Sequence, residues 1–220
     1  MAQTEQKNQN VKKQFEELQS LLERAMALQT SMVLFEWDDE TLAPKGAAEH
    51  TARVIGSLSE QYQEILASMR FKELLDACQK AEKENAGVFD EVQSAILREA
   101  AEEQERLSCI PPEEYRAYAE LTARATGIWT RAREKNDFAS FAPVLKEIIS
   151  YQKKFAAYRA KPGQKLYDVM LDTYEKGFNM EMLDPFFELM KGKIVPLLKE
   201  SAERSKTVPD AFLSADYPEA

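Results

Sequence analysis

The chain has 220 residues, of which 44% are hydrophobic and 30% are charged, and it contains only seven glycines. This balance favours a helix-rich globular protein, because an all-β chain needs more turns. The formal net charge of −9 argues against a nucleic-acid or anionic-membrane partner, and no apolar run approaches the length of a membrane span.

Apolar residues at spacings of three and four predict amphipathic helices that are separated by proline and glycine. Residues 1–10 are expected to be disordered, and the first helix runs from Val11 to about Glu36. The second helix is expected to direct five side chains inward: Val54, Leu58, Tyr62, Ile65 and Met69. The third is expected to bury Phe71, Leu74, Leu75 and Cys78.

The middle helices are marked by their first turns. Pro111 and Pro112 stand where proline is best tolerated, at the start of a helix that ends near Asn136. Ser140 is the predicted N-cap of the next helix, with Pro143 in its first turn.

A short helix is predicted to end at Gly177, and Asn179 caps a last helix that Pro185 and Pro196 bend or split. The sequence shows no strand-like alternation and no internal repeat. The predicted class is therefore all-α, an antiparallel, bundle-like array of at least six helices. One helical domain is expected over 11–206, followed by a tail over 207–220 that looks interrupted.

The cell compartment is predicted from the first residues and the cysteines. The start, MAQTEQKNQN, is polar and lacks the apolar core of a signal peptide. Cys78 and Cys109 are too few for a disulfide framework, so both are predicted to be free thiols. These features predict a cytoplasmic protein.

The segment VLFEWDDETLAPKGAAEH, residues 33–50, combines a run of carboxylates with the only histidine of the chain. Catalytic zinc usually requires two histidines, in helices as HExxH, and a single histidine excludes such a pair within this chain. A di-iron bundle requires a glutamate three residues before the histidine, where this chain has Ala47. The run WDDET also lacks the glycine and ligand spacing of a calcium loop. We therefore predict no catalytic or metal-ligating residue here.

A structural interpretation of the segment is better supported. Trp37 follows an apolar helix face and is expected to be a large core residue at the helix end. Asp38, Asp39 and Glu40 are expected to be exposed or to serve the following turn, and His50 to be an exposed or half-buried helix residue. The charged run AEEQERL, residues 101–107, is interpreted as a solvated face.

Three blocks of residues carry a resemblance to a known family. The first combines a Trp-Asp-x-Glu-Thr segment, a proline–glycine turn and a Leu-Ser pair, at Trp37, Asp38, Glu40, Thr41, Pro44, Gly46, Leu58 and Ser59. The second is Trp129, Ala132, Arg133, Asn136, Asp137, Phe138, Phe141 and Pro143. The third is Tyr167, Asp168, Leu171, Asp172, Tyr174, Glu175 and Gly177. In this order the blocks resemble the N-terminal half of the Taq-type thermostable metallocarboxypeptidases, with turn-level departures at Ala47 and Lys176.

The resemblance implies a mostly helical, two-lobed peptidase with a deep cleft, commonly a homodimer. Such an enzyme removes C-terminal residues from peptides, using zinc or cobalt held by HExxH and a later glutamate. In the family these motifs lie in the second half of a longer chain, and this sequence contains none of them. We therefore expect no metal site and no activity from this chain alone. The signature residues of the three blocks are interpreted as structural, and no substrate-binding residue is assigned.

Two functions from different classes remain open. The chain is either the N-terminal part of a metal-dependent carboxypeptidase, as a truncated, split or degenerate copy, or a stand-alone helical interaction module derived from one. A reading frame that continues into HExxH favours the first, and a stop codon favours the second. Apolar faces normally covered by the second lobe are expected to cause self-association, with these candidates: Phe186, Phe187, Met190, Leu197, Leu198, Phe212 and Tyr217.

Overall fold

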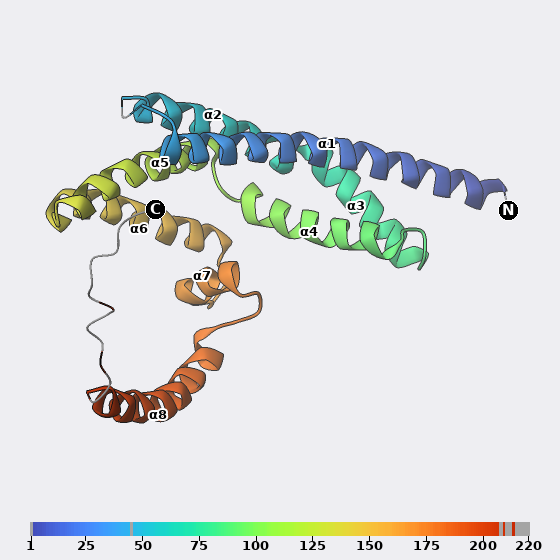
Figure 1. Cartoon of the computed structure of the whole chain (residues 1–220). Coiled ribbons are helices and arrows are strands. Elements are labelled where there is room, and N and C mark those ends of the chain that lie inside the picture. The colour runs from blue at the N-terminus through green and yellow to red at the C-terminus, as the bar shows by residue number, and fades with distance from the viewer. Residues whose placement is uncertain (1, 45, 207–208, 210–212, 214–220) are drawn as a thin grey trace. The chain divides into compact units, whose positions relative to one another are not determined.

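The structure is a computed structural model that describes residues 2–44, 46–206, 209 and 213. This part of the chain forms eight α-helices and no strand (Figure 1), which confirms the predicted all-α class. The helices are α1 (Ala2–Thr41), α2 (Ala48–Ala67), α3 (Met69–Glu84), α4 (Glu91–Ser108), α5 (Pro112–Glu134), α6 (Phe138–Arg159), α7 (Leu166–Tyr174) and α8 (Met180–Ser205).

The contacts divide the chain into two compact units, Met1–Arg159 and Ala160–Ala220. The boundary at Arg159 was not predicted from the sequence, which placed residues 11–206 in one helical domain. Helix α1 also begins at Ala2 rather than near Val11. The residues before Val11 include alanine, glutamine, glutamate and lysine, which propagate a helix without an apolar stripe. Phe212 and Tyr217 lie outside the described residues.

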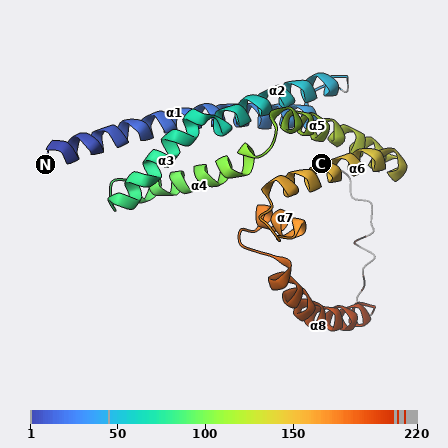
Figure 2. The ribbon, with the colours of Figure 1, turned by 180° about the vertical axis from the view of Figure 1, so that it is seen from behind.

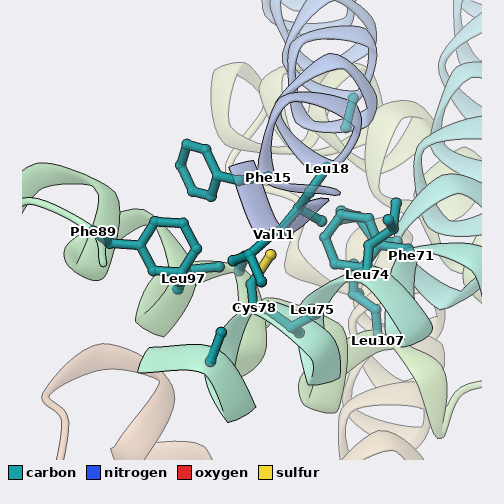
Figure 3. Packing of buried hydrophobic residues seen from close by; sticks show 14 residues of the cluster. Val11, Phe15, Leu18, Phe71, Leu74, Leu75, Cys78, Phe89, Leu97 and Leu107 are labelled. Carbon is teal, nitrogen blue, oxygen red and sulfur yellow. The ribbon is translucent and has the colours of Figure 1, made fainter. Parts of the chain in front are cut away.

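The core of the first unit lies where α1, α3 and α4 pack together (Figure 3). Phe71, Leu74, Leu75 and Cys78 of α3 are buried, as their spacing predicted. The rings of Phe15 and Phe89 stack with centroids 5.1 Å apart. Full burial of each leucine or phenylalanine side chain contributes about 1.5–3 kcal/mol, so this cluster supplies much of the driving force for folding.

Helix α2 packs against α1 and α5 through small side chains. Its buried residues are Thr51, Ala52, Ile55, Gly56, Ser59, Gln63 and Leu66. The predicted inward set was right in part: Tyr62 and Ile65 are partly buried against the core cluster, Val54 and Leu58 are half-buried, and Met69 is exposed. A Cβ atom added at Gly56 would lie 2.3 Å from Cγ of Glu120, so the glycine permits the close approach of α2 and α5.

Two helix boundaries differ from the sequence-based prediction. Helix α1 continues through Trp37 to Thr41, and Trp37 is 56% exposed rather than a core residue. Trp37 lies twelve positions after the buried Ala25, which turns it about 120° away from the packed face. Helix α6 begins at Phe138, and the Asp137 carboxylate caps it by accepting a hydrogen bond from the backbone N–H of Ser140 at 3.2 Å. Ser140 is therefore inside the helix, and Pro143 lies beyond its first turn.

The second unit contains α7 and α8. Asn179 caps α8 as predicted, because its side-chain oxygen accepts a hydrogen bond from the backbone N–H of Met182 at 3.1 Å. Helix α8 is continuous from Met180 to Ser205 and is not split at either of its two prolines. None of its residues is buried.

Candidate functional site

The carboxylate-rich segment forms the end of α1, which lies beside α2 and α5 (Figure 2). Side chains of these three helices line an open pocket. The pocket has a volume of about 240 Å³. Its walls are formed by Glu36, Asp39 and Glu40 from α1, by Ala48, Thr51, Ala52 and Ile55 from α2, and by Thr122, Ala123 and Thr126 from α5. The sequence segment that looked most like a chemical site therefore lines a cavity, although the partners from α5 were not predicted.

The acidic wall follows from helix geometry. Asp39 and Glu40 follow Glu36 by three and four residues, so both lie next to Glu36 on one side of α1. Partial desolvation raises the pKa of Glu36, and the negative charge of Glu40 raises it further. None of these three carboxylates forms an ion pair or a hydrogen bond with another described residue. The pocket therefore presents uncompensated negative charge.

The other polar residues of the segment have different positions. The main-chain carbonyl of Asp38 accepts hydrogen bonds from the N–H groups of Leu42 and Ala43 at 2.9 and 2.8 Å, which ends α1. The hydroxyl of Thr41 donates to the carbonyl of Trp37 at 2.6 Å. His50 is exposed on α2, and Pro44 is exposed in the turn between α1 and α2. Of the segment's predicted signature residues, only Glu40 reaches the pocket.

The described residues contain no group of three or more histidine, cysteine, aspartate or glutamate side chains that could hold a metal ion. The pocket carboxylates are thus too dispersed to act as a compact ligand set. The residues present do not fit a catalytic zinc or cobalt site, and the expectation that the chain binds no such metal remains a prediction. Across the described part of the chain, no helix is long and apolar enough to cross a membrane.

The second signature block lies at the junction of α5 and α6. The guanidinium of Arg133 lies over the ring of Trp129, 5.2 Å from its centroid, and both side chains are exposed. Asp137 provides the N-cap of α6, and Phe138 is exposed directly after it. Within this block, Asp137 caps α6, Ala132 is buried, and Asn136 has a φ of 51° in the turn that follows α5.

The third signature block organises the turn between α7 and α8. The carboxylate of Asp168 accepts a hydrogen bond from the N–H of Met180 at 2.9 Å, and that of Asp172 accepts one from the N–H of Gly177 at 2.8 Å. Gly177 has φ +82°, a conformation that glycine adopts without a steric penalty. Tyr167, Tyr174 and Glu175 are exposed. Asp168 therefore holds the start of α8 against α7, and Asp172 fixes the turn between them.

Sequence reasoning missed one polar cluster. Glu103 and Arg106 lie in the run interpreted as a solvated face, yet Tyr62 donates a hydrogen bond to Glu103 at 3.0 Å. The Nε of Arg106 donates to the same carboxylate at 2.8 Å. Burial raises the pKa of Tyr62 far above its usual range, and Glu103 adds to the effect. Since Glu103 precedes Arg106 by three residues, their spacing indicated the ion pair but not its contact with α2.

Comparison with known proteins identifies the family to which the three signature blocks belong. The family model described as carboxypeptidase Taq (M32) metallopeptidase matches residues 17–220. The chain belongs to this family. Carboxypeptidase 1 of Bacillus subtilis is 32% identical over 198 residues, which is 90% of this chain and 38% of that protein.

Two solved structures of the family have the same fold as this chain. The crystal structure of BsuCP matches with a TM-score of 0.80 and 32% identity, over 86% of this chain and 37% of that one. Metallocarboxypeptidase 1 of Trypanosoma cruzi matches with a TM-score of 0.71 and 26% identity, over 94% of this chain and 40% of that one. The chain therefore spans about two fifths of the length of the family members it matches.

Proposed function

We propose that this chain supplies the N-terminal helical region of a cytoplasmic, metal-dependent carboxypeptidase, which removes C-terminal residues from peptides. The family match over residues 17–220 carries this proposal. Asp137 and Asp168 accept backbone N–H groups at the starts of α6 and α8, and Asp172 accepts one in the turn between α7 and α8, which supports a structural role for these signature residues.

The metal ion, zinc or cobalt, is proposed to belong to the part of the family fold that this chain does not span. A single histidine leaves the chain without the donor set that activates water. Metal analysis after dialysis is expected to give far less than one zinc per chain, with no release of C-terminal amino acids from peptides. Stoichiometric zinc together with turnover would contradict this division of roles.

A chimaera tests the proposal directly. Residues 1–220 replace the matched region of Bacillus subtilis carboxypeptidase 1, and the same protein with that region deleted is the control. We expect the chimaera to trim peptides from the C-terminus only with metal bound, and the deletion control to be inactive. A folded, metal-loaded chimaera without activity would show that the chain has lost the function of its relatives.

The surface of α8 favours a second candidate function, a helical interaction module that self-associates. A homodimer, which the family resemblance implies, is one form of such self-association. Large apolar side chains of α8 are exposed: Phe186, Phe187, Leu189, Met190, Ile194, Val195, Leu197 and Leu198. Apolar patches above about 400 Å² commonly mark interaction sites. The rings of Phe186 and Phe187 also meet edge to face, with centroids 5.5 Å apart.

Light scattering at micromolar concentration tests this second candidate. The chain is expected to associate, and Phe187→Ser is expected to shift the equilibrium toward the monomer. Lys193→Ser, at an exposed polar position of the same helix, is the matched control. A strictly monomeric chain, or equal effects of the two substitutions, would exclude association through α8.

A further inference from the structure

The pocket at the end of α1 has a second unusual property besides its acidic wall. Threonine hydroxyls inside helices commonly donate to the carbonyl four residues earlier. Where side chains are described, the helical threonines that do so are Thr30, Thr41, Thr122, Thr130 and Thr173. The hydroxyls of Thr51 and Thr126 form no such bond and no other hydrogen bond within the described residues, and both residues line the pocket.

Thr51 is the more informative of the two because it is only 8% exposed. Its hydroxyl oxygen stays accessible from the pocket and has no partner among the described residues, so it can bind a ligand that displaces water there. Thr51 and Thr126 come from different helices, and the carboxylates come from a third. The pocket thus combines hydrogen-bond acceptors on three sides with uncompensated negative charge on one of them.

The chemistry of the lining specifies the ligand class. The carboxylates are too dispersed for a metal ion, but a planar group with several donors can reach acceptors in different directions. Ala52 and Ile55 provide an apolar wall for an alkyl stem. The volume of about 240 Å³ equals that of about eight water molecules, which is room for one extended side chain.

We propose that this pocket binds the guanidinium group of an arginine side chain presented by a peptide or protein. Glu36, Asp39 and Glu40 supply the charge, and the hydroxyls of Thr51 and Thr126 accept further N–H groups. Partial desolvation and then the charge of Glu40 raise the pKa of Glu36, and a cation bound beside this carboxylate offsets both effects. The proposal does not depend on carboxypeptidase activity.

The test uses the full chain and three probes: N-acetyl-arginine amide, its lysine counterpart and its citrulline counterpart, which has the same shape without the charge. Binding is followed by NMR titration at low salt. We expect saturable shifts centred on Thr51 and Thr126 with the arginine probe, weaker binding of lysine and no binding of citrulline. Equal binding of citrulline or lysine, or shifts centred elsewhere, would overturn the assignment.

Variants separate a specific site from general attraction to an acidic protein. Glu36→Gln and Asp39→Asn are each expected to weaken binding by about tenfold or more, since each removes a charge-assisted hydrogen bond. Glu23→Gln, at an exposed position of the same helix, is the matched control and should bind as the unaltered chain does. Equal losses in all three variants, or no saturable binding to the unaltered chain, would refute the proposal.

Discussion

Replacing Gln63 by glutamate is the sharpest test of how α2 supports the end of α4. Gln63 is fully buried, and its Nε2 donates hydrogen bonds to the carbonyls of Leu107 at 3.0 Å and Ile110 at 2.6 Å. The Leu107 carbonyl, at the end of α4, also accepts a hydrogen bond from the N–H of Ile110 at 3.1 Å, and Ile110 lies in the turn before α5. Glutamate keeps the shape of glutamine but turns the only donor into a second acceptor.

The expected loss is large because a carboxylate would be buried against two carbonyl oxygens. The variant loses both hydrogen bonds and gains an uncompensated buried charge, which costs about 3–5 kcal/mol at neutral pH. The pKa of the new carboxyl would be raised above its unfolded value of about 4.3, so the charge penalty is absent below that pH, where the neutral carboxyl can donate one hydrogen bond in place of two. The loss then grows as the pH rises through the folded-state pKa.

Urea unfolding of Gln63→Glu at pH 4.5 and pH 7 measures this effect. Circular dichroism follows the helices, and tryptophan fluorescence reports on the first unit, since Trp37 and Trp129 both lie there. Gln61→Glu is the control, because Gln61 is exposed two residues earlier. If Gln63→Glu matched Gln61→Glu at pH 7, or lost the same stability at both pH values, the reasoning would be refuted.

Three further predictions concern single side chains. Burial raises the pKa of the Cys78 thiol to about 11, so iodoacetamide should label Cys109 in the native chain and label Cys78 only after unfolding; rapid native labelling of Cys78 would contradict its burial. Asp168→Ala should cost about 1 kcal/mol and speed hydrogen exchange at the Met180 amide; unchanged exchange there would exclude the bond. Glu36→Gln should stabilise the chain at pH 7 by less than about 1 kcal/mol and have no effect below pH 4. The reason is that a carboxyl whose pKa is raised in the folded state lowers the free energy of unfolding as the pH rises. The opposite pH trend in urea unfolding would disprove this.

The sequence predicted the helices well where their apolar face is wide. Helix α3 shows this best, since Phe71, Leu74, Leu75 and Cys78 lie on one face and all are buried. The proline and asparagine signals also marked the starts of α5 and α8. Such signals depend only on residues that are neighbours in the sequence, so they can be recognised without knowledge of the tertiary fold.

The sequence did not predict the buried face of α2 or the position of Trp37. The seam of α2 uses small and polar residues such as Gly56, Ser59 and Gln63, and hydrophobicity alone does not select them. Trp37 was assigned to the core because of its size. Helix α1 continues past it to Thr41, so the direction of its side chain is set by its position on the helix, away from the packed face. The pocket required α5 as a third wall, and the meeting of residues so far apart in the chain, such as 36 and 126, around one pocket leaves no local pattern in either segment.

The two prolines inside α8 have a mechanical consequence. Pro185 and Pro196 are eleven residues apart, which is three helical turns, so both lie on nearly the same side of α8. Each lacks the N–H that would bind the carbonyl four residues earlier, at Glu181 and Gly192, and its ring presses against that carbonyl. The two bends therefore add in one plane, and Figure 1 shows α8 as an arc. A helix bowed in this way can follow a curved surface along its whole length, which a straight rod would touch at only one place.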